Sequence, residues 1–253
     1  MPKISAVIVA HNEENKIEEC LKSLDFVDEI VVVLDKCTDS TKQIVQKFTN
    51  KIIEGSWNIE GARRNVALNA ASHDWILEID CDERVSRDLA DEILQVIKNS
   101  VFCAYQVSFL NYVGKRLVKF GWIRTLAPLE RQILTFKGCK KYHEDKEIHP
   151  TFDLNAEIKL LKNPLIHLMD DDISDMIARF NRFTTWRAND IISKGKFKKS
   201  GLIKALFEFD FRFFKSFVLK KGYKEGRLGF LIATLSGLYP LVSHLKAKEK
   251  ILR

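Results

Sequence analysis

The sequence predicts an α/β protein in which a mostly parallel central sheet is followed by a C-terminal helical region. Three observations support this fold class. Short apolar runs alternate with helical patterns over the first hundred residues, polar clusters follow the apolar runs, and the pattern becomes purely helical after residue 170. Repeated strand and helix units imply parallel strands joined by right-handed crossovers, with ligands bound at the carboxyl ends of the strands.

Four strands and three helices are expected in the first hundred residues. The run ISAVIVA at 4–10 is typical of a buried strand, and the β-branched run IVVVL at 30–34 is typical of a parallel strand covered on both faces. Apolar residues at helical spacing predict a helix between them. In chain order the expected strands are 4–10, 30–34, 52–53 and 75–79, and the expected helices are 15–24, 40–48 and 61–71.

Three further strand-like stretches, 104–112, 132–136 and 157–167, suit a mixed edge of the same sheet. From Asp171 the pattern turns helical, with Asp170 to Asp172 available as N-terminal caps. We therefore divide the chain into an α/β domain at 1–168, with halves 1–100 and 101–168, and a helical region at 169–253. Two more helices are expected in that region, at 202–220 and 224–248, separated by Gly222.

Composition excludes several classes of protein. Of the 253 residues, 46% are hydrophobic and 30% are charged, which is typical of a folded chain and not of a disordered one. The N-terminus has no basic stretch or long apolar core, so we expect no cleaved secretory leader. The five cysteines include no CxxC pair, which argues against a disulfide framework and a zinc ribbon and favours a reducing compartment. They are Cys20, Cys37, Cys81, Cys103 and Cys139.

The net charge of +7 is concentrated near the end of the chain. Residues 1–195 hold 27 Lys and Arg against 30 Asp and Glu, whereas 196–227 hold 10 against 3 and 228–253 hold 4 against 1. A local basic block indicates an anionic surface as a partner.

An acidic cluster, Asp80-Cys81-Asp82-Glu83, follows the expected strand at 75–79. Residues two apart in a strand face the same way, so Asp80 and Asp82 are expected to project together. Adjacent carboxylates repel unless a cation lies between them, and oxygen ligands suit Mg²⁺ or Mn²⁺ bridging to phosphate. The alternative is that these acids only cap the helix that starts near Ser86.

Other polar residues converge on the same sheet edge. Asn12 and Glu13 follow the first strand, and Asp35 follows the second. Arg63 and Arg64 open the third helix, where an arginine and free N–H groups form a phosphate cradle. We expect only one of these two arginines to point inward. For Asp39 the alternative is an ordinary helix cap, since Ser40 and Thr41 follow it.

An ordered set of motifs resembles family 2 glycosyltransferases of the GT-A fold, and most of all the bacterial lipopolysaccharide core β-glycosyltransferases. The matching stretches are ISAVIVAHNEENKIEECLKSLDFVDEIVVVLDKCTDST, GARRNVALNAASHDWILEIDCDERVS, FGW, YHE and IHLMDDDISDMIARFNRFTTWRA. The resemblance implies a nucleotide-sugar-binding half at 1–100 and an acceptor half at 101–168.

The resemblance also implies roles for individual residues. Glu13 and Asp35 would lie near the uracil and ribose of a UDP-sugar, Arg64 near the diphosphate, and Asp80 with Asp82 would hold a divalent cation, Mg²⁺ or Mn²⁺. The full set of expected donor contacts is Ala10, Asn12, Glu13, Asp35, Arg64 and Asp80. The loop at 34–41 departs from the usual DSGSTDGT pattern, which shifts the nucleoside-contacting Asp by as much as one position.

Inverting transfer needs a base that deprotonates the acceptor hydroxyl while the leaving diphosphate is neutralised. Under the resemblance the base lies in Tyr142-His143-Glu144-Asp145; Glu144 is the first candidate and Asp145 the second. A carboxylate suits this role if partial burial raises its pKa, and the alternative is a surface acid. Arg131-Gln132-Ile133 stands where relatives carry Arg-Leu-Phe, which bears on the identity of the acceptor.

Four other side chains have both a functional and a structural interpretation. His143 is a candidate to orient the base, and His167 is a candidate to reach phosphate or metal. Trp57 and Trp122 are candidates to stack on a sugar. For His167 and the two tryptophans the alternative is ordinary core packing.

Six of the 17 phenylalanines lie in residues 202–219, interleaved with Lys and Arg. A basic helix with an aromatic face suits an anionic membrane surface, and the alternative is packing on the domain or in a dimer. The uncharged stretch 229–245 is shorter than a span requires and contains Pro240.

The leading hypothesis is a cytoplasmic, membrane-surface enzyme that transfers a hexose from a nucleotide sugar, UDP-glucose first, to a lipid-linked saccharide such as the lipopolysaccharide inner core. Transfer to polyprenyl phosphate, capsule or protein is the second hypothesis. A nucleic-acid-binding protein is the third, but the charge is confined to one end and the sequence has no recognised binding module.

Overall fold

The computed structural model describes residues 2–98, 100–125, 131–145, 150–155, 157–197 and 201–252. The chain forms two units, Met1–Phe109 with Pro128–His167 and Leu110–Ala127 with Leu168–Arg253. We call the first the sheet unit and the second the helical unit. The chain crosses between them within strands β7 (Phe109–Val113) and β13 (Leu165–Asp170). The division at residue 168 stays a prediction about domains; residues 110–127 group with the later segment.

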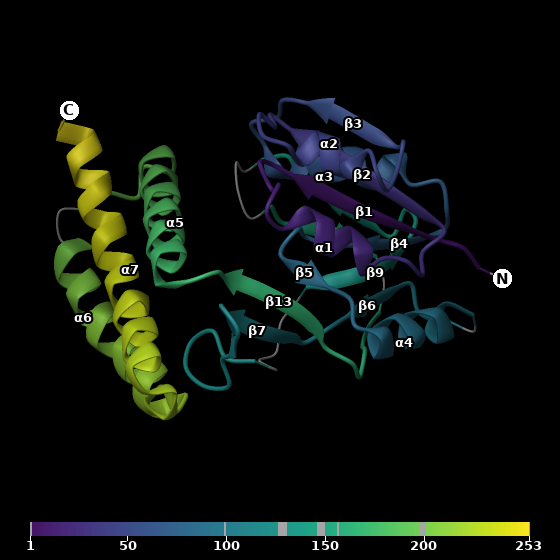
Figure 1. Cartoon of the computed structure of the whole chain (residues 1–253). Helices are drawn as coiled ribbons and strands as arrows, with labels where there is room; N and C mark the ends of the chain where they lie inside the picture. The colour runs from purple at the N-terminus through teal and green to yellow at the C-terminus, as the bar shows by residue number, and fades with distance from the viewer. Residues whose placement is uncertain are drawn as a thin grey trace. The chain divides into compact units, whose positions relative to one another are not determined.

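A seven-stranded sheet forms the centre of the sheet unit (Figure 1), in the order β12-β6-β9-β4-β1-β2-β3. β1 pairs in parallel with β2 and β4, and β2 pairs in parallel with β3, whereas β9 runs antiparallel to β4 and β6. The expected α/β fold with a mostly parallel sheet is confirmed. The strands are β1 (Ile4–Ala10), β2 (Glu29–Asp35), β3 (Ile52–Gly55), β4 (Trp75–Glu78), β6 (Ala104–Gln106), β9 (Gln132–Phe136) and β12 (Ile158–Leu160).

Helices cover both faces of this sheet because the side chains of β1 point alternately to each side. Ile4 and Ile8 pack with α1 (Ile17–Lys22), α2 (Thr41–Val45) and α4 (Arg87–Lys98). Val7 packs on the other face with α3 (Glu60–Ala70). α1 and α2 are shorter than the helices expected at 15–24 and 40–48, because hydrogen-bonded turns replace their last residues.

The two long strands expected at 104–112 and 157–167 are each divided. β6 and β12 join the seven-stranded sheet, whereas β7 and β13 leave it, so the expectation of a single mixed edge is wrong for the later part of each stretch. Backbone bonds from Leu161 N to Gln106 O (2.8 Å) and from Leu165 N to Ser108 O (2.9 Å) fix these bends. Short pairs complete the strands: β5 (Glu83–Arg84) with β13, β8 (Arg116–Leu117) with β7, and β10 (Lys140–Tyr142) with β11 (Phe152–Leu154).

Three long helices dominate the helical unit, and α7 packs against both α5 and α6 (Figure 1). Asp172 caps α5 by accepting the Asp175 N–H at 2.8 Å, as the sequence predicted. A π-helical turn extends α6, and a short 3₁₀ turn at Gly222 leads into α7. The elements are α5 (Ile173–Ser193), α6 (Gly201–Phe214), η1 (Lys215–Leu219), η2 (Gly222–Glu225) and α7 (Gly226–Leu252).

By length and composition, one described helical segment is sufficient to cross a bilayer: Gly222–Leu252, with 31 residues. Our sequence expectation had considered only 229–245, which is shorter. Of its most apolar window, 44% is buried within the protein. Gly229, Ile232 and Ala233 begin a buried face that continues along the helix, which is also typical of a packed helix in a soluble domain.

Candidate active site

A pocket of about 200 Å³ lies at the carboxyl edge of the sheet. Its walls come from the end of β1, the first turn of α3 and the loop after β4, which are three of the segments that the sequence placed at this edge. The lining residues are Val9, Glu13, Arg63, Arg64, Asp80, Cys81 and Asp82. Both arginines line it, so the expectation that only one points inward is wrong.

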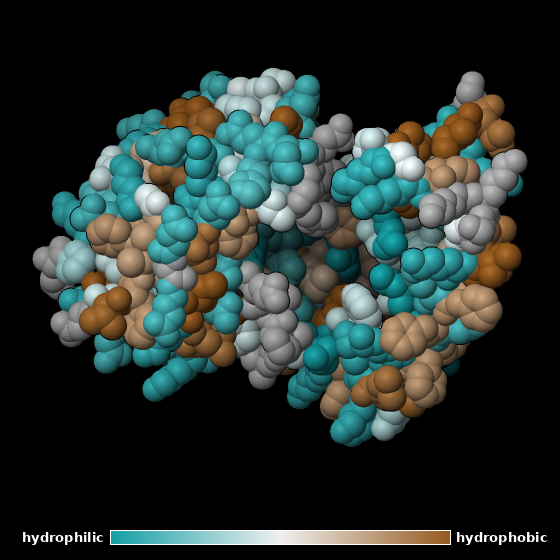
Figure 2. Space-filling model, turned by 180° about the vertical axis from the view of Figure 1, so that it is seen from behind, coloured by the Kyte–Doolittle hydropathy of each residue, from teal (hydrophilic) through white to brown (hydrophobic). Residues whose placement is uncertain are grey.

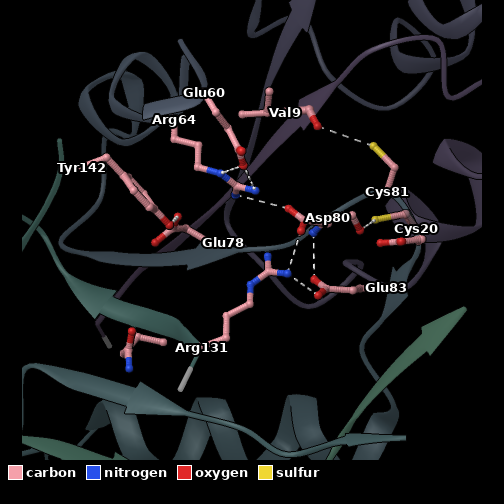
Figure 3. Close-up of polar contacts among 12 residues, drawn as sticks. Val9, Cys20, Glu60, Arg64, Glu78, Asp80, Cys81, Glu83, Arg131 and Tyr142 are labelled. Carbon is pink, nitrogen blue, oxygen red and sulfur yellow. Dashed lines mark hydrogen bonds and ion pairs between the residues drawn. The ribbon is translucent and has the colours of Figure 1, made fainter. Parts of the chain in front are cut away.

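Asp80 lies between two guanidinium groups (Figure 3). Arg64 Nη1 is 3.3 Å from Oδ1, and Arg131 Nη1 is 2.6 Å from Oδ2. Burial alone would raise the pKa of Asp80, but the charges of Arg131 and Arg64 outweigh it and hold the pKa below its usual range. Asp80 is therefore ionised across the physiological range and fixed in one orientation.

Glu83 supports this arrangement from the core. It is fully buried, accepts the Asp80 N–H at 2.8 Å and forms an ion pair with Arg131. Burial, together with repulsion from Asp80 and Asp82, raises the pKa of Glu83 despite the Arg131 charge. The sequence interpretation gave neither Glu83 nor Arg131 this role, since the two lie 48 positions apart and only the pairing of β9 with β4 brings them together.

Asp82 has different surroundings. Its Oδ2 lies 3.5 Å from Nε2 of His167, whose ring centroid is 4.9 Å from that of Phe109 with the two planes tilted by 40°. Glu13 lies on the same pocket, and burial followed by repulsion from Asp82 raises its pKa to about 7. The capping alternative is not observed, because the helix after this loop begins with the Ser86 hydroxyl accepting the Leu89 N–H. The closeness of Glu13 and Asp82 therefore favours a proton on Glu13.

This donor chemistry fits a hard divalent cation. Carboxylate oxygens suit Mg²⁺ or Mn²⁺, and Mg²⁺ usually takes one or two carboxylates and completes its shell with water and substrate phosphates. Among the residues that the structure describes, no three His, Cys, Asp or Glu side chains form an all-protein metal site. Asp80 already pairs with two arginines, and Asp82 lies 3.5 Å from His167, so the metal role of the pair stays a prediction.

The loops after β1 and β2 contain several of the residues that were expected to contact the donor. Asp35 is buried, accepts the Trp57 N–H at 2.9 Å and pairs with Arg63 Nη1 at 2.6 Å. Asn12, at φ 56°, accepts the Thr38 N–H at 2.8 Å. Ala10 is fully buried, and its carbonyl lies 3.5 Å from the Cys37 thiol. Their contacts with a donor stay predictions.

Asp39 has a structural role at the start of α2, although the N-cap position itself is Ser40 and not Asp39. Its Oδ1 accepts the N–H and hydroxyl of Thr41, at 3.0 and 2.6 Å, and its Oδ2 accepts the Glu14 N–H. Trp57 also packs structurally, over Gly55 and within the apolar cluster beneath α3. In the helical unit, Lys220 Nζ lies 3.9 Å above the Trp122 ring.

α3 brings the expected base to the edge of the same region. Asn65 donates from Nδ2 to Glu144 Oε1 at 2.9 Å and to the Tyr142 carbonyl at 2.9 Å. A Cβ at Gly61 would collide with the His143 carbonyl oxygen, so glycine permits this close approach. Glu144 and Asp145 are both exposed, so the partial burial that we expected for the base is not observed.

His143 does not contact the acid that it was expected to orient. Its ring nitrogens lie 2.9 Å from Asp153 and 3.1 Å from the Thr151 hydroxyl. The group that orients Glu144 is instead the Asn65 amide. The neighbouring Tyr142 belongs to a buried network that the sequence did not reveal: its hydroxyl donates to Glu78 at 2.7 Å, and Lys140 pairs with Glu78 at 2.6 Å.

The sequence model for glycosyl transferase family 2 matches residues 5–152, more than half of the chain. The chain belongs to glycosyltransferase family 2. A similar protein, an uncharacterized glycosyltransferase of Rickettsia felis, is 26% identical over all of this chain and 92% of its own length. The lipopolysaccharide core biosynthesis glycosyltransferase LpsC of Rhizobium meliloti is 22% identical over 99% of this chain and 94% of its own.

The fold agrees with this family. The crystal structure of Staphylococcus aureus TarS 1-349 superposes with a TM-score of 0.51 at 18% identity, covering 98% of this chain and 88% of that one. The GT-A fold expected from the resemblance is therefore confirmed, whereas the role of the sheet edge with the Asp80 loop stays a prediction.

Proposed function

We propose that this glycosyltransferase moves a hexose, with UDP-glucose as the first candidate donor, to a lipid-linked saccharide such as the lipopolysaccharide inner core, with inversion at the anomeric carbon. One observation supports the donor side above all: acids and arginines face each other across one pocket, Asp80 and Asp82 against Arg63 and Arg64. A nucleoside diphosphate with its cation carries both charges that such a pocket binds. The LpsC likeness supports the acceptor class.

The donor is proposed to bind through Ala10, Asn12, Glu13, Asp35, Arg64 and Asp80. Asp35 and Glu13 bound the nucleoside end, and Arg64, held by Glu60 at 2.9 Å and by Asp80, presents its guanidinium to the diphosphate. Asp82, beside Asp80, would hold the Mg²⁺ or Mn²⁺. When bound, the cation neutralises charge that develops on the departing diphosphate.

The base is proposed to be Glu144, with Asp145 as the alternative. As the acceptor oxygen attacks the anomeric carbon and the bond to the diphosphate breaks, the Glu144 carboxylate takes the hydroxyl proton. The Asn65 amide donates to Oε1 and so leaves Oε2 to face the acceptor. Asn65 follows Arg64 directly, so one helix turn supports groups for the leaving group and for the base.

The sharpest test of this function is a panel of UDP-, GDP- and CMP-sugars with and without Mn²⁺, read by thermal shift and by donor hydrolysis. We expect stabilisation by UDP and UDP-glucose only when the cation is present. Equal shifts with all three nucleotides, or a shift that ignores Mn²⁺, would contradict the donor assignment.

The proposed lipid-linked acceptor would be held at a membrane. We propose that the enzyme works as a peripheral protein on the cytoplasmic face of an anionic membrane, where lipid-linked saccharides are presented. Release of the protein from bacterial membranes by alkaline carbonate is expected, whereas retention would indicate that Gly222–Leu252 spans the bilayer.

A further inference from the structure

α6 and its π-helical extension have two apolar faces, of which only one is covered by the protein. On the inner face, the rings of Phe209, Phe213 and Phe217 stack at the four-residue spacing of a helix, with centroids 6.3 and 5.5 Å apart. Phe213 and Phe217 also pack edge-on against Phe230 of α7. Gly237 lets α7 approach Phe209 closely, because a Cβ there would lie only 2.9 Å from its ring.

The second face, which we call the outer face, is open. Phe207, Phe211 and Phe214 are 72%, 61% and 51% exposed, although phenylalanine is usually buried. Spacings of three, four and eight residues place the exposed side chains on one side of the helix over about four turns. Apolar surface on the helical unit is visible in brown in Figure 2. The outer face consists of Ile203, Leu206, Phe207, Phe211, Phe214 and Val218.

Positive charge accumulates at the C-terminal end of this helix. Lys220 has its pKa lowered by burial and then by the charges of Arg124 and Lys215. Lys221 and Lys224 follow at exposed positions. Two of the three acids at 202–227 are paired: Glu225 is buried and pairs with Arg116 at 2.6 Å, and Glu208 lies 3.9 Å from Lys204. The third, Asp210, is exposed and lies between Leu206 and Phe214 on the outer face, so the positive charge is concentrated at residues 215–224. The cations therefore repel one another and would gain from an external anion.

We propose that the outer face docks on an anionic phospholipid bilayer, with Phe207, Phe211 and Phe214 entering the interface and the basic residues at 215–224 contacting lipid phosphates. The inference deepens the proposed function, because it names the surface by which an enzyme with a lipid-linked acceptor reaches its membrane. An aromatic face flanked by Lys and Arg is the pattern of a helix that lies in the membrane plane. Each basic residue near an anionic surface contributes about 1 kcal/mol.

Two other occupants fit the charges less well. A second copy of the chain, joined by a two-fold axis near residues 215–224, would bring these cations together, so they would repel. If the helix spanned the membrane, its charged residues would have to enter the hydrocarbon core, which argues against a transmembrane arrangement. These residues are Lys204, Glu208, Asp210 and Arg212. An anionic bilayer accepts both the apolar side chains and the cations.

The test is flotation of the whole protein with vesicles of phosphatidylcholine alone, or with about 30% phosphatidylglycerol, at low and high salt. We expect binding to the anionic vesicles, weakened at high salt, and little binding to the neutral ones. The double variant Phe207→Ser/Phe211→Ser should bind about a hundredfold more weakly, from the loss of two inserted rings. The variant Lys220→Ser/Lys221→Ser/Lys224→Ser should bind more weakly and lose its salt dependence.

Matched controls use exposed residues of the sheet unit. Val101→Ser removes an 87% exposed apolar side chain, and Lys47→Ser removes an exposed cation; both should float like the original protein. Circular dichroism melting of every variant checks folding, and Mn²⁺-dependent stabilisation by UDP should persist in the outer-face variants. If the original protein floats with anionic vesicles but does not bind UDP, the proposed function is contradicted and the docking surface is still supported.

Three results would overturn the docking surface. The first is equal flotation of the phenylalanine double variant and the original protein. The second is equal binding to neutral and anionic vesicles. The third is a dimer in sedimentation that the double variant abolishes while no vesicle is bound, which would assign the outer face to a second copy of the chain.

Discussion

The carboxyl edge of the sheet and the end of α6 both concentrate charge, but they balance it differently. At the sheet edge the acids face arginines: Asp35 pairs with Arg63, and Asp80 lies between Arg64 and Arg131. Near the end of α6, burial and the charges of Arg124 and Lys215 lower the pKa of Lys220. A region whose charges are matched internally is organised before its ligand arrives. A region with unmatched cations depends on an external anion, and the two regions should therefore respond differently to substitution and to salt.

The largest effect is expected from Asp82→Ala. Removing the proposed cation ligand should abolish Mn²⁺-dependent stabilisation by UDP and lower kcat/KM about a thousandfold, because the diphosphate would leave without compensation. Melting curves with UDP and Mn²⁺ measure the first effect, and donor turnover measures the second. Asp91→Asn, at an exposed position of α4, is the matched control. Unchanged melting shifts in Asp82→Ala would remove the cation from this position.

Glu144→Gln should lose about a hundredfold in kcat while donor KM and UDP binding stay the same, because the amide cannot accept the proton. Asn65→Ala tests the positioning of that base and should reduce kcat by about tenfold while donor KM stays the same. Steady-state kinetics with the acceptor separates the two parameters. If Glu144→Gln keeps its turnover while Asp145→Asn loses it, the base is Asp145.

Arg131→Ala tests how far the sheet edge depends on internal pairing. It leaves Glu83 buried without its cation and removes one of the two arginines from Asp80. We expect a loss of about 3 kcal/mol in the free energy of unfolding, as is usual when one partner of a buried pair is removed. Urea denaturation measures this loss. Arg87→Ala breaks a more exposed pair with Asp25 and should cost less than about 1 kcal/mol; equal losses would contradict the comparison.

The smallest effect concerns Glu13 and pH. Its folded pKa of about 7 lies above the ordinary 4.5, so the folded state holds this proton more tightly than the unfolded state. The stability from Glu13 is therefore complete below pH 4.5 and is lost as pH rises through 7. Between pH 5 and pH 8 the original protein should lose about 1 kcal/mol of stability, or about 2–4 °C in Tm, that the Glu13→Gln variant does not lose.

Glu29 provides a control of opposite sign. Burial would raise its pKa, but bonds from Lys51, Ser5 and Ser72 lower it to about 2. Its contribution is present above pH 4.5 and is lost as pH falls toward 2. Glu29→Gln should therefore flatten the acid side of the Tm profile and leave the Glu13 range unchanged. Identical profiles for the two variants would contradict both assignments.

Local sequence patterns were sufficient to predict the elements whose structure depends mainly on residues close together in the chain. The strand at 4–10 was predicted with its observed bounds, α3 within one residue at each end, and the Asp172 cap from its sequence context. In contrast, the sequence did not reveal the contacts of Arg131 with Glu83 or of Lys140 with Glu78. Each of these joins residues at least 48 positions apart, and each depends on the antiparallel insertion of β9 beside β4.

The same limit applies to the candidate site. Motifs identified which acids gather at the sheet edge, because the carboxyl ends of parallel strands share one edge. They could not show which partner each of these acids binds: Asp35 pairs with Arg63, and Asp80 pairs with Arg64 and Arg131. Partner choice depends on side-chain geometry in the folded protein, which spacing along a chain does not encode.

Gly61 lets α3 lie directly against the segment that follows β10. The missing side chain lets the helix lie against the His143 carbonyl, and Asn65 donates a hydrogen bond to Glu144. Displacement of this helix would therefore also displace Glu144, the proposed base. If the diphosphate binds at Arg64 as proposed, the adjacent Asn65 would connect that event directly to Glu144. A bulkier residue at position 61 would push α3 away from the His143 carbonyl and weaken this connection.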